Sequence, residues 1–203
     1  PDVSLNIVPA VTTVANTEQK VLFIGQKTSA GTATAGTLVT DIQNDNSWDT
    51  LFGERSMLAQ GLRAARKLNP SVRFDVIPLD DPSTGNAPAV ATVVFGGTAT
   101  EDGTLTFYVS SRKNHSYVVS VVSGDDATAI GAKLETQIDL DDKVPATAAA
   151  ATGTVTLTAA NEGTEGNSTP LAYTGSVAGV TVTLNAFASG SGTVDTSGVA
   201  ALI

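Results

Sequence analysis

The chain has 203 residues, of which 41% are apolar and 15% charged, with a net charge of −9 and no cysteine. Without cysteine it has no disulfide framework, no thiolate metal site and no cysteine nucleophile. The acidic excess is uneven, because residues 89–203 carry four basic and eleven acidic groups, a net of −7. That charge repels phosphate, and no basic stripe with interleaved aromatic residues occurs, so we predict no nucleic-acid partner.

Apolar runs in the sequence are short. None approaches the roughly 20 residues that span a bilayer, so we expect no direct membrane insertion. The first residues lack a charged segment followed by an apolar one, so no signal peptide is predicted. Thr, Ser, Asn and Gly supply most of the polar residues, a composition typical of a β-rich, turn-rich surface.

The first forty residues contain one predicted strand. Residues 1–19 have no strong amphipathic period, and two interpretations stay open: a loose terminal arm, or a strand that pairs with a neighbouring subunit. Residues 21–24 are continuously apolar, which predicts a strand buried on both faces. Residues 27–40 are rich in Gly and Thr but lack both glycine-rich phosphate-binding motifs, so we expect a solvated connector.

Residues 47–81 organise the first part of the chain, as one predicted helix followed by one strand. The helix has an apolar stripe at helical spacing, formed by Leu58, Leu62, Ala65 and Leu68. Ser56 is a candidate N-cap for its later part, and Pro70 ends it. The strand follows at 72–79. Strand, helix and strand together indicate a partial α/β layer over residues 20–88.

Residues 80–88 gather Pro, Gly, Asn, Asp and Ser and mark a boundary. Beyond it, patterns of period two predict strands at 90–95, 105–109, 117–122, 155–159 and 180–184. The similar segments 152–159 and 178–186 are interpreted as paired neighbours in one sheet. The predicted fold class is therefore α+β.

The rest of the second part is predicted from shorter signals. One helix is predicted from the spacing of Ile130, Leu134 and Ile138, with Asp125 and Asp126 at its N-terminal end. The alanine-rich residues 146–152 are expected to be a connector, and residues 161–167 a turn-rich loop. The last residues, 196–203, resemble the first turns of a helix and suggest that the chain is a fragment.

No catalytic, cofactor-binding or metal-binding site is predicted. His115 is the only histidine and lies in a polar turn, so we interpret it as a surface residue without a nucleophile or zinc partners. The carboxylate clusters lack the spacing of a calcium loop and are interpreted as solvated acids or caps; they are Asp80/Asp81, Asp125/Asp126 and Asp139/Asp141/Asp142. We therefore expect no enzyme and no cofactor.

One group of basic residues accompanies the predicted helix. It consists of Arg55, Arg63, Arg66 and Lys67, which we place on the exposed face of the predicted helix. Two interpretations stay open: an ordinary solvated helix face, or a patch that meets an acidic partner subunit or an acidic tube. The glycosylation patterns at Asn114 and Asn167 carry little meaning without a secretory signal.

Several segments, in this order, resemble one family. They are KVLFIGQ at 20–26, WDTLFGERSMLAQGLRAARKLNP at 48–70, FDVIPL at 74–79, GGTATEDGTLTFYV at 96–109, VPAT at 144–147, VTLTA at 155–159 and GTEGN at 163–167. This combination resembles the N-terminal part of contractile-tail sheath proteins of the Mu-like phage type. Sheath proteins of that family continue well beyond the length of this chain.

The resemblance implies an architecture and a mechanical function. It implies an N-terminal arm at residues 1–19, an inserted antiparallel β-rich outer domain carrying one helix at 89–189, and a return to the α/β domain at 190–203. Sheath subunits self-assemble into hexameric rings stacked around a tail tube and contract after a baseplate signal, which drives the tube through the host envelope. The expected location is the virion tail, assembled in the host cytoplasm.

A second function remains open at this point. The β-rich domain is compatible with a virion-surface adhesin or carbohydrate-binding module that uses its loops, such as residues 162–169, as a binding rim. The chain has one Trp, three Tyr and six Phe, so aromatic residues for stacking on sugars are few.

Overall fold

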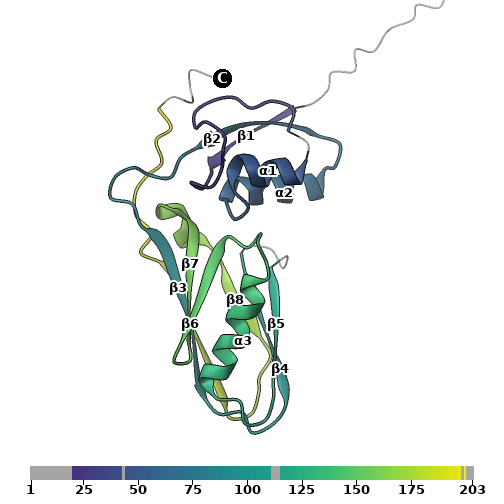
Figure 1. Cartoon of the computed structure of the whole chain (residues 1–203), viewed down its shortest axis with the longest axis vertical. Helices are drawn as coiled ribbons and strands as arrows, with labels where there is room; N and C mark the ends of the chain where they lie inside the picture. Colours follow the sequence, from purple (N-terminus) through teal and green to yellow (C-terminus); the bar gives the residue numbers. More distant parts are fainter. Residues whose placement is uncertain (1–19, 43, 111–114, 198, 200–203) are drawn as a thin grey trace, which may run out of the picture.

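The chain folds into two parts that lie end to end (Figure 1). Figure 1 shows a computed structural model, in which the structure describes residues 20–42, 44–110, 115–197 and 199. A small α/β part holds the first two strands and two helices, and a longer β-rich part holds the remaining strands and one helix. The predicted arm at residues 1–19 lies outside the described residues.

The α/β part is built on a pair of parallel strands. Strands β1 (Lys20–Gln26) and β2 (Arg73–Leu79) run in register over seven residues. Helices α1 (Asp45–Phe52) and α2 (Met57–Leu68) cover one face of this pair. The core between them is fully buried because its large side chains come from both layers; they include Trp48, Phe52, Leu58, Leu62, Phe74 and Val76.

The single helix predicted here is in fact two. Gly53, at φ +86°, ends α1, and Ser56 begins α2 by accepting a hydrogen bond from Ala59 N at 3.1 Å. The proposed Ser56 cap is thus confirmed. The expected apolar stripe is wrong at Leu68, the last residue of α2, which is 71% exposed.

The prediction that β1 is buried on both faces is also wrong. Val21 and Ile24 are 41% and 43% exposed. A parallel strand is normally covered on both faces and flanked on both edges, but within the described residues the sheet has only β1 and β2. The apolar run therefore belongs to a strand whose outer edge is open.

The β-rich part contains two antiparallel sheets. One has four strands in the order β6 (Ala146–Ala151), β7 (Thr154–Glu162), β3 (Pro88–Gly97) and β9 (Val180–Ala188). The other has three strands in the order β5 (Ser116–Val121), β4 (Gly103–Val109) and β8 (Leu171–Thr174). Their inner faces share one core. In it, the rings of Phe95 and Phe107 pack edge to face, with their centroids 5.7 Å apart.

Helix α3 (Ala127–Asp139) closes the open side of the two sheets, where it packs on β6 and β5 (Figure 1). Asp126 caps it by accepting a hydrogen bond from Ala129 N at 2.8 Å, as the sequence predicts. Ile130, Leu134 and Ile138 are at most 1% exposed, which confirms the predicted apolar face.

Two sequence expectations for the β-rich part are wrong, and one strand was missed. The alanine-rich connector is strand β6, which pairs with β7 through a two-residue turn at Thr152 and Gly153, both at positive φ. Strands β7 and β9 are not direct neighbours, because β3 lies between them. Strand β8 was not expected from the sequence at all.

The last described residues return to the α/β part, where Val199 packs on Ile77 and Leu79. The helix predicted at 196–203 falls largely outside the described residues. The described helices and strands confirm the α+β class, with a parallel pair in one part and antiparallel sheets in the other.

Leu134→Ala should lower the free energy of unfolding by about 2–5 kcal/mol, because it leaves a cavity under α3 where the side chain is fully buried. Leu140→Ala is the matched control, since Leu140 is 75% exposed and its loss should cost less than about 0.5 kcal/mol. Urea denaturation measures both values. Equal effects of the two substitutions would contradict the packing of α3 on the two sheets.

Candidate functional site

The two parts meet at a junction that is mainly polar. Asn161 of β7 is 1% exposed and reaches into the α/β part. Its side-chain oxygen accepts a hydrogen bond from Met57 N, the free first-turn amide of α2, at 2.8 Å. Its amide donates to Lys27 O at 3.0 Å and to Asp81 Oδ1 at 2.8 Å. One side chain therefore holds a helix start, a strand end and a linker together.

Asp81 is the second centre of the junction. Its Oδ1 also accepts a hydrogen bond from Gln26, whose amide donates at the same time to Glu162 O at 2.8 Å. Burial raises the pKa of the Asp81 carboxyl, and the hydrogen bonds that it accepts oppose this rise only in part. Lys27, only 8% exposed, forms an ion pair with Asp80 at 2.7 Å. The segment that begins at Lys27 is therefore not simply a solvated connector.

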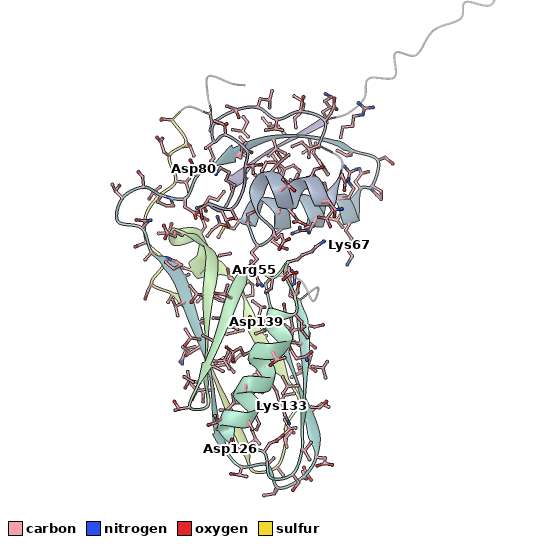
Figure 2. All side chains as sticks on the ribbon, viewed as in Figure 1. Arg55, Lys67, Asp80, Asp126, Lys133 and Asp139 are labelled. Atoms are coloured by element: carbon pink, nitrogen blue, oxygen red, sulfur yellow. The ribbon has the colours of Figure 1, made fainter. Side chains whose placement is uncertain are left out.

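Ionic contacts form the other side of the junction. Arg55 donates to Ala146 O at 2.7 Å, and Lys143 Nζ lies 2.8 Å from Asp45 of α1. Figure 2 shows Arg55 between the two parts. Burial and the paired charges of Lys143 and Arg63 act in opposite directions on Asp45, and the net effect is a lowered pKa of its carboxyl.

The predicted basic surface patch is wrong for most of its members. Arg63 forms ion pairs with Asp45, at 2.7 Å, and with Asp49, and its side chain is 15% exposed. The Arg66 guanidinium lies over the ring of Phe74, 4.6 Å from its centroid. These arginines stabilise the α/β part itself, because carboxylates and aromatic rings of the same part surround them.

His115 is not the surface residue that the sequence suggested. It is 9% exposed, and its Nδ1 lies 2.7 Å from Asp141 Oδ2. Its Nε2 lies 3.3 Å from Gln60 Oε1 on α2. Both ring nitrogens thus have partners, and neither is available to take a proton from a nucleophile.

Asp141 is the acceptor at the centre of this cluster. It also receives hydrogen bonds from the Tyr117 hydroxyl at 2.8 Å and from Lys143 N at 2.9 Å. Burial works against its ionisation, but the hydrogen bonds from His115, Lys143 and Tyr117 outweigh it and lower the pKa of Asp141 to about 2. The same carboxylate, together with burial, raises the pKa of the Tyr117 hydroxyl.

Asp125 and Asp126 interact with residues of helix α3. Asp126 caps α3, and Asp125 forms an ion pair with Lys133 on the same helix. Figure 2 shows Asp126, Lys133 and Asp139 along the exposed side of that helix. Within the described residues no group of three or more His, Asp or Glu side chains could hold a metal ion. Nor does any helix in that part of the chain have the length and apolar character of a membrane span.

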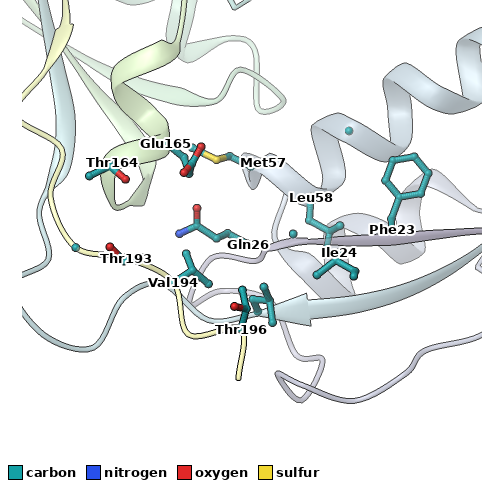
Figure 3. A pocket seen from close by; sticks show the side chains of 14 residues that line it. Phe23, Ile24, Gln26, Met57, Leu58, Thr164, Glu165, Thr193, Val194 and Thr196 are labelled. Atoms are coloured by element: carbon teal, nitrogen blue, oxygen red, sulfur yellow. The ribbon is translucent and has the colours of Figure 1, made fainter. Parts of the chain in front are cut away.

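A hollow follows the open edge of β1 (Figure 3). It has a volume of about 510 Å³. Met57, Leu58 and Gly61 of α2 form one wall, and the returning residues 192–196 form the other. Phe23 and Ile24 of β1 lie along it, and the Ile24 side chain is 43% exposed. Within the described residues no strand pairs with β1 on this side, so the groove lies beside an unpaired strand edge.

The suggested binding rim at residues 162–169 closes one end of this groove. Its residues form the 3₁₀ helix η1 (Thr164–Ser168), in which Gly166 is buried against Ala89 and Ala159. Thr164 and Glu165 line the groove (Figure 3). Asn167 bonds the backbone of Gly190 with both its amide atoms, whereas Asn114 lies outside the described residues.

No signal in the sequence pointed to the residues of the junction. Asn161, Gln26 and Gln60 belong to no chemical motif, because amides that join two parts of a chain have no fixed spacing. The exposure of Ile24 was equally hidden, since a buried strand and an open-edged strand have the same apolar run.

Asp141→Asn should lower the free energy of unfolding by about 1–3 kcal/mol near neutral pH, because it removes a charged hydrogen-bond acceptor. The pKa of this carboxyl is lower in the folded chain, so its contribution is complete above the ordinary value of 3.8 and is lost as the pH falls to about 2. Urea denaturation should show the wild-type advantage disappear over that interval.

The control for this titration is Asp139→Asn, at an exposed position two residues away. It should change the free energy of unfolding by less than about 0.5 kcal/mol at every pH. If the difference between wild type and Asp141→Asn stays constant down to about pH 2, the Asp141 carboxylate does not stabilise the fold through its charge.

Comparison with known proteins identifies the family. No protein-family model matches the chain. Among curated proteins, the chain is 36% identical over 148 residues to the Mu-like prophage FluMu tail sheath protein of Haemophilus influenzae. The match covers 73% of this chain and 29% of that relative's length, so the chain spans less than a third of the relative.

This similarity confirms the resemblance seen in the sequence. It extends over most of the chain and indicates a structural component of a bacteriophage tail. The chain therefore belongs to the family of tail sheath proteins.

Proposed function

We propose that the chain is part of a subunit that polymerises as stacked hexameric rings around a tail tube and contracts to drive the tube through the host envelope. The observation that carries this proposal is the 36% identity, over 148 residues, to a Mu-like tail sheath protein. The subunit works in the virion tail, is assembled in the host cytoplasm, and has the tail tube and the baseplate as partners besides copies of itself.

The open edge of β1 supports a role in a larger assembly. Two parallel strands do not make a stable layer alone, and Val21 and Ile24 leave apolar surface beside an unpaired edge. We infer that residues 20–88 are part of an α/β layer that gains further strands from protein outside the described residues. Main-chain pairing along β1 and apolar contacts in the groove would hold them.

The other segments receive roles consistent with that assembly. Residues 1–19 are an N-terminal arm that pairs with a neighbouring subunit, and residues 190–203 return the chain to the α/β layer. Residues 89–189 are an inserted outer domain. Its acidic charge faces solvent and keeps neighbouring particles apart.

Contraction requires two packings of the same subunits that differ by a modest free energy. Arms joined by backbone pairing let rigid bodies rotate without losing their neighbours. The separate hydrophobic cores of the α/β and β-rich parts suit such a subunit, because each core stays intact while contacts between subunits change.

Ile24→Asp should abolish polymerisation, because it places a charge beside the edge where the additional strand pairs. The thermal melt of the subunit should stay near that of wild type, since the Ile24 side chain is already 43% exposed. Val118→Asp, at a 53% exposed position of β5, is the matched control and should polymerise normally. Electron microscopy of the purified subunits measures the result.

Two results would contradict the proposal. Rings or tubes of the Ile24→Asp protein would remove the role of the β1 edge. Dispersed wild-type monomers that bind a glycan array would instead favour the adhesin considered from the sequence. Rings of six-fold symmetry from the wild-type protein are the expected result.

Deletion of residues 1–19 tests the arm. We expect polymerisation to be lost while the thermal melt of the β-rich part is unchanged, because that part has its own core. A matched variant in which residues 1–19 are replaced by a Gly/Ser segment of equal length controls for chain length. Polymers formed by either variant would show that the arm is dispensable.

A further inference from the structure

His115 lies where the β-rich part meets helix α2. It precedes β5, and its main-chain oxygen accepts a hydrogen bond from Val109 N at 3.1 Å, which fixes the backbone beside the ring. The ring projects towards two oxygens that belong to different elements: Asp141, in the loop after α3, and Gln60, on α2 of the α/β part.

The partner of Nδ1 is an acceptor only. Asp141 Oδ2 lies 2.7 Å from Nδ1 and already accepts a hydrogen bond from the Tyr117 hydroxyl, while Oδ1 accepts one from Lys143 N. A carboxyl with these donors around it is ionised near neutral pH and has no proton to offer. The hydrogen between Asp141 and the ring must therefore be carried by Nδ1.

The partner of Nε2 is also an acceptor. Gln60 Oε1 faces Nε2 at 3.3 Å, and the other end of the same amide, Nε2 of Gln60, donates to Lys143 O. Exchanging the two ends of the amide would set its oxygen against that carbonyl, so the orientation is decided by Lys143 O. A hydrogen bond between the ring and Gln60 thus requires a hydrogen on Nε2 as well.

We propose that His115 is a proton-dependent clasp: its doubly protonated ring links Asp141 to Gln60 across the junction, and loss of one proton opens the contact with α2. The neutral ring with its hydrogen on Nδ1 would place a lone pair against Gln60 Oε1. Histidine side chains ordinarily change charge at pH ~6.5, within the physiological range. This inference concerns contacts within one chain and does not depend on the proposed assembly.

The charged groups around the ring favour the same form. From the loop after α3, Asp141 faces the ring directly, while Lys143 is paired with Asp45 of α1. From the segment before α2, Arg55 is engaged with Ala146 O and lies 3.9 Å from Asp142. From β5, Tyr117 presents its hydroxyl to Asp141. The charged group in direct contact with the ring is therefore the Asp141 carboxylate, which favours the doubly protonated ring.

The clasp has a defined pH dependence. The ring can donate to both Asp141 and Gln60 only while both of its nitrogens carry hydrogen, so the proposal predicts that stability is greatest at mildly acidic pH and falls as the pH rises through neutrality. The other members of the cluster do not interfere, because the pKa of Asp141 is about 2 and that of Tyr117 is raised above its usual range.

Nitrogen-15 NMR of the ring tests the protonation state, and the assignment is unambiguous because the chain has one histidine. Near pH 6 we expect both ring nitrogens to carry hydrogen in wild type. Gln60→Met, which keeps the length of the side chain but removes the acceptor, should lose the second hydrogen at a lower pH. A singly protonated wild-type ring near pH 6, or identical titrations of the two proteins, would overturn the proposal.

Urea denaturation tests the consequence for stability. The wild-type midpoint should be higher near pH 5.5 than near pH 8, by on the order of 0.5 M. His115→Asn is the matched control, since its amide can donate to Asp141 but does not gain a proton, and its two midpoints should agree. If wild type and His115→Asn depend on pH to the same extent, another group is responsible and the clasp does not exist.

Discussion

The hydrogen bonds of Asn161 are the constraint on which the relation between the two parts depends. This amide is 1% exposed, and its partners come from the start of α2, the end of β1 and the linker to β3. A buried amide is stable only if its polar groups are paired, and the groups that it pairs would otherwise be unsatisfied as well. The β-rich part is therefore oriented by directional bonds rather than by a shared apolar core.

A polar junction has consequences for the movement of the two parts. Each hydrophobic core lies within its own part, and the two parts are joined by amides, ion pairs and one histidine. Such contacts specify one geometry but bury little apolar surface, so changing a few of them costs less than separating two halves of a core. The proposed response of His115 to pH lies at this junction, between the loop after α3 and helix α2.

The open edge of β1 differs from the polar junction, because apolar side chains are exposed there. Within the described residues no strand pairs with this edge, and a groove of about 510 Å³ lies beside it. The β-rich part has a core of its own, in which α3 and the two sheets bury large side chains such as Phe107, Leu134 and Leu157. Within the described residues the chain thus combines a part with two packed sheets and a part with a single pair of strands.

The sequence alone determined the fold class, the family, the cap at Ser56 and the apolar face of α3, because each depends on local spacing or on a recognisable order of segments. Only the tertiary structure decided the strand at 146–151, since alanines have little intrinsic preference for strands and pair here because β7 lies beside them. The same holds for His115, Arg63 and Ile24, whose burial or exposure depends on partners distant in the chain. Spacing along a sequence carries no information about such partners, because it records neighbours in the chain and not neighbours in space.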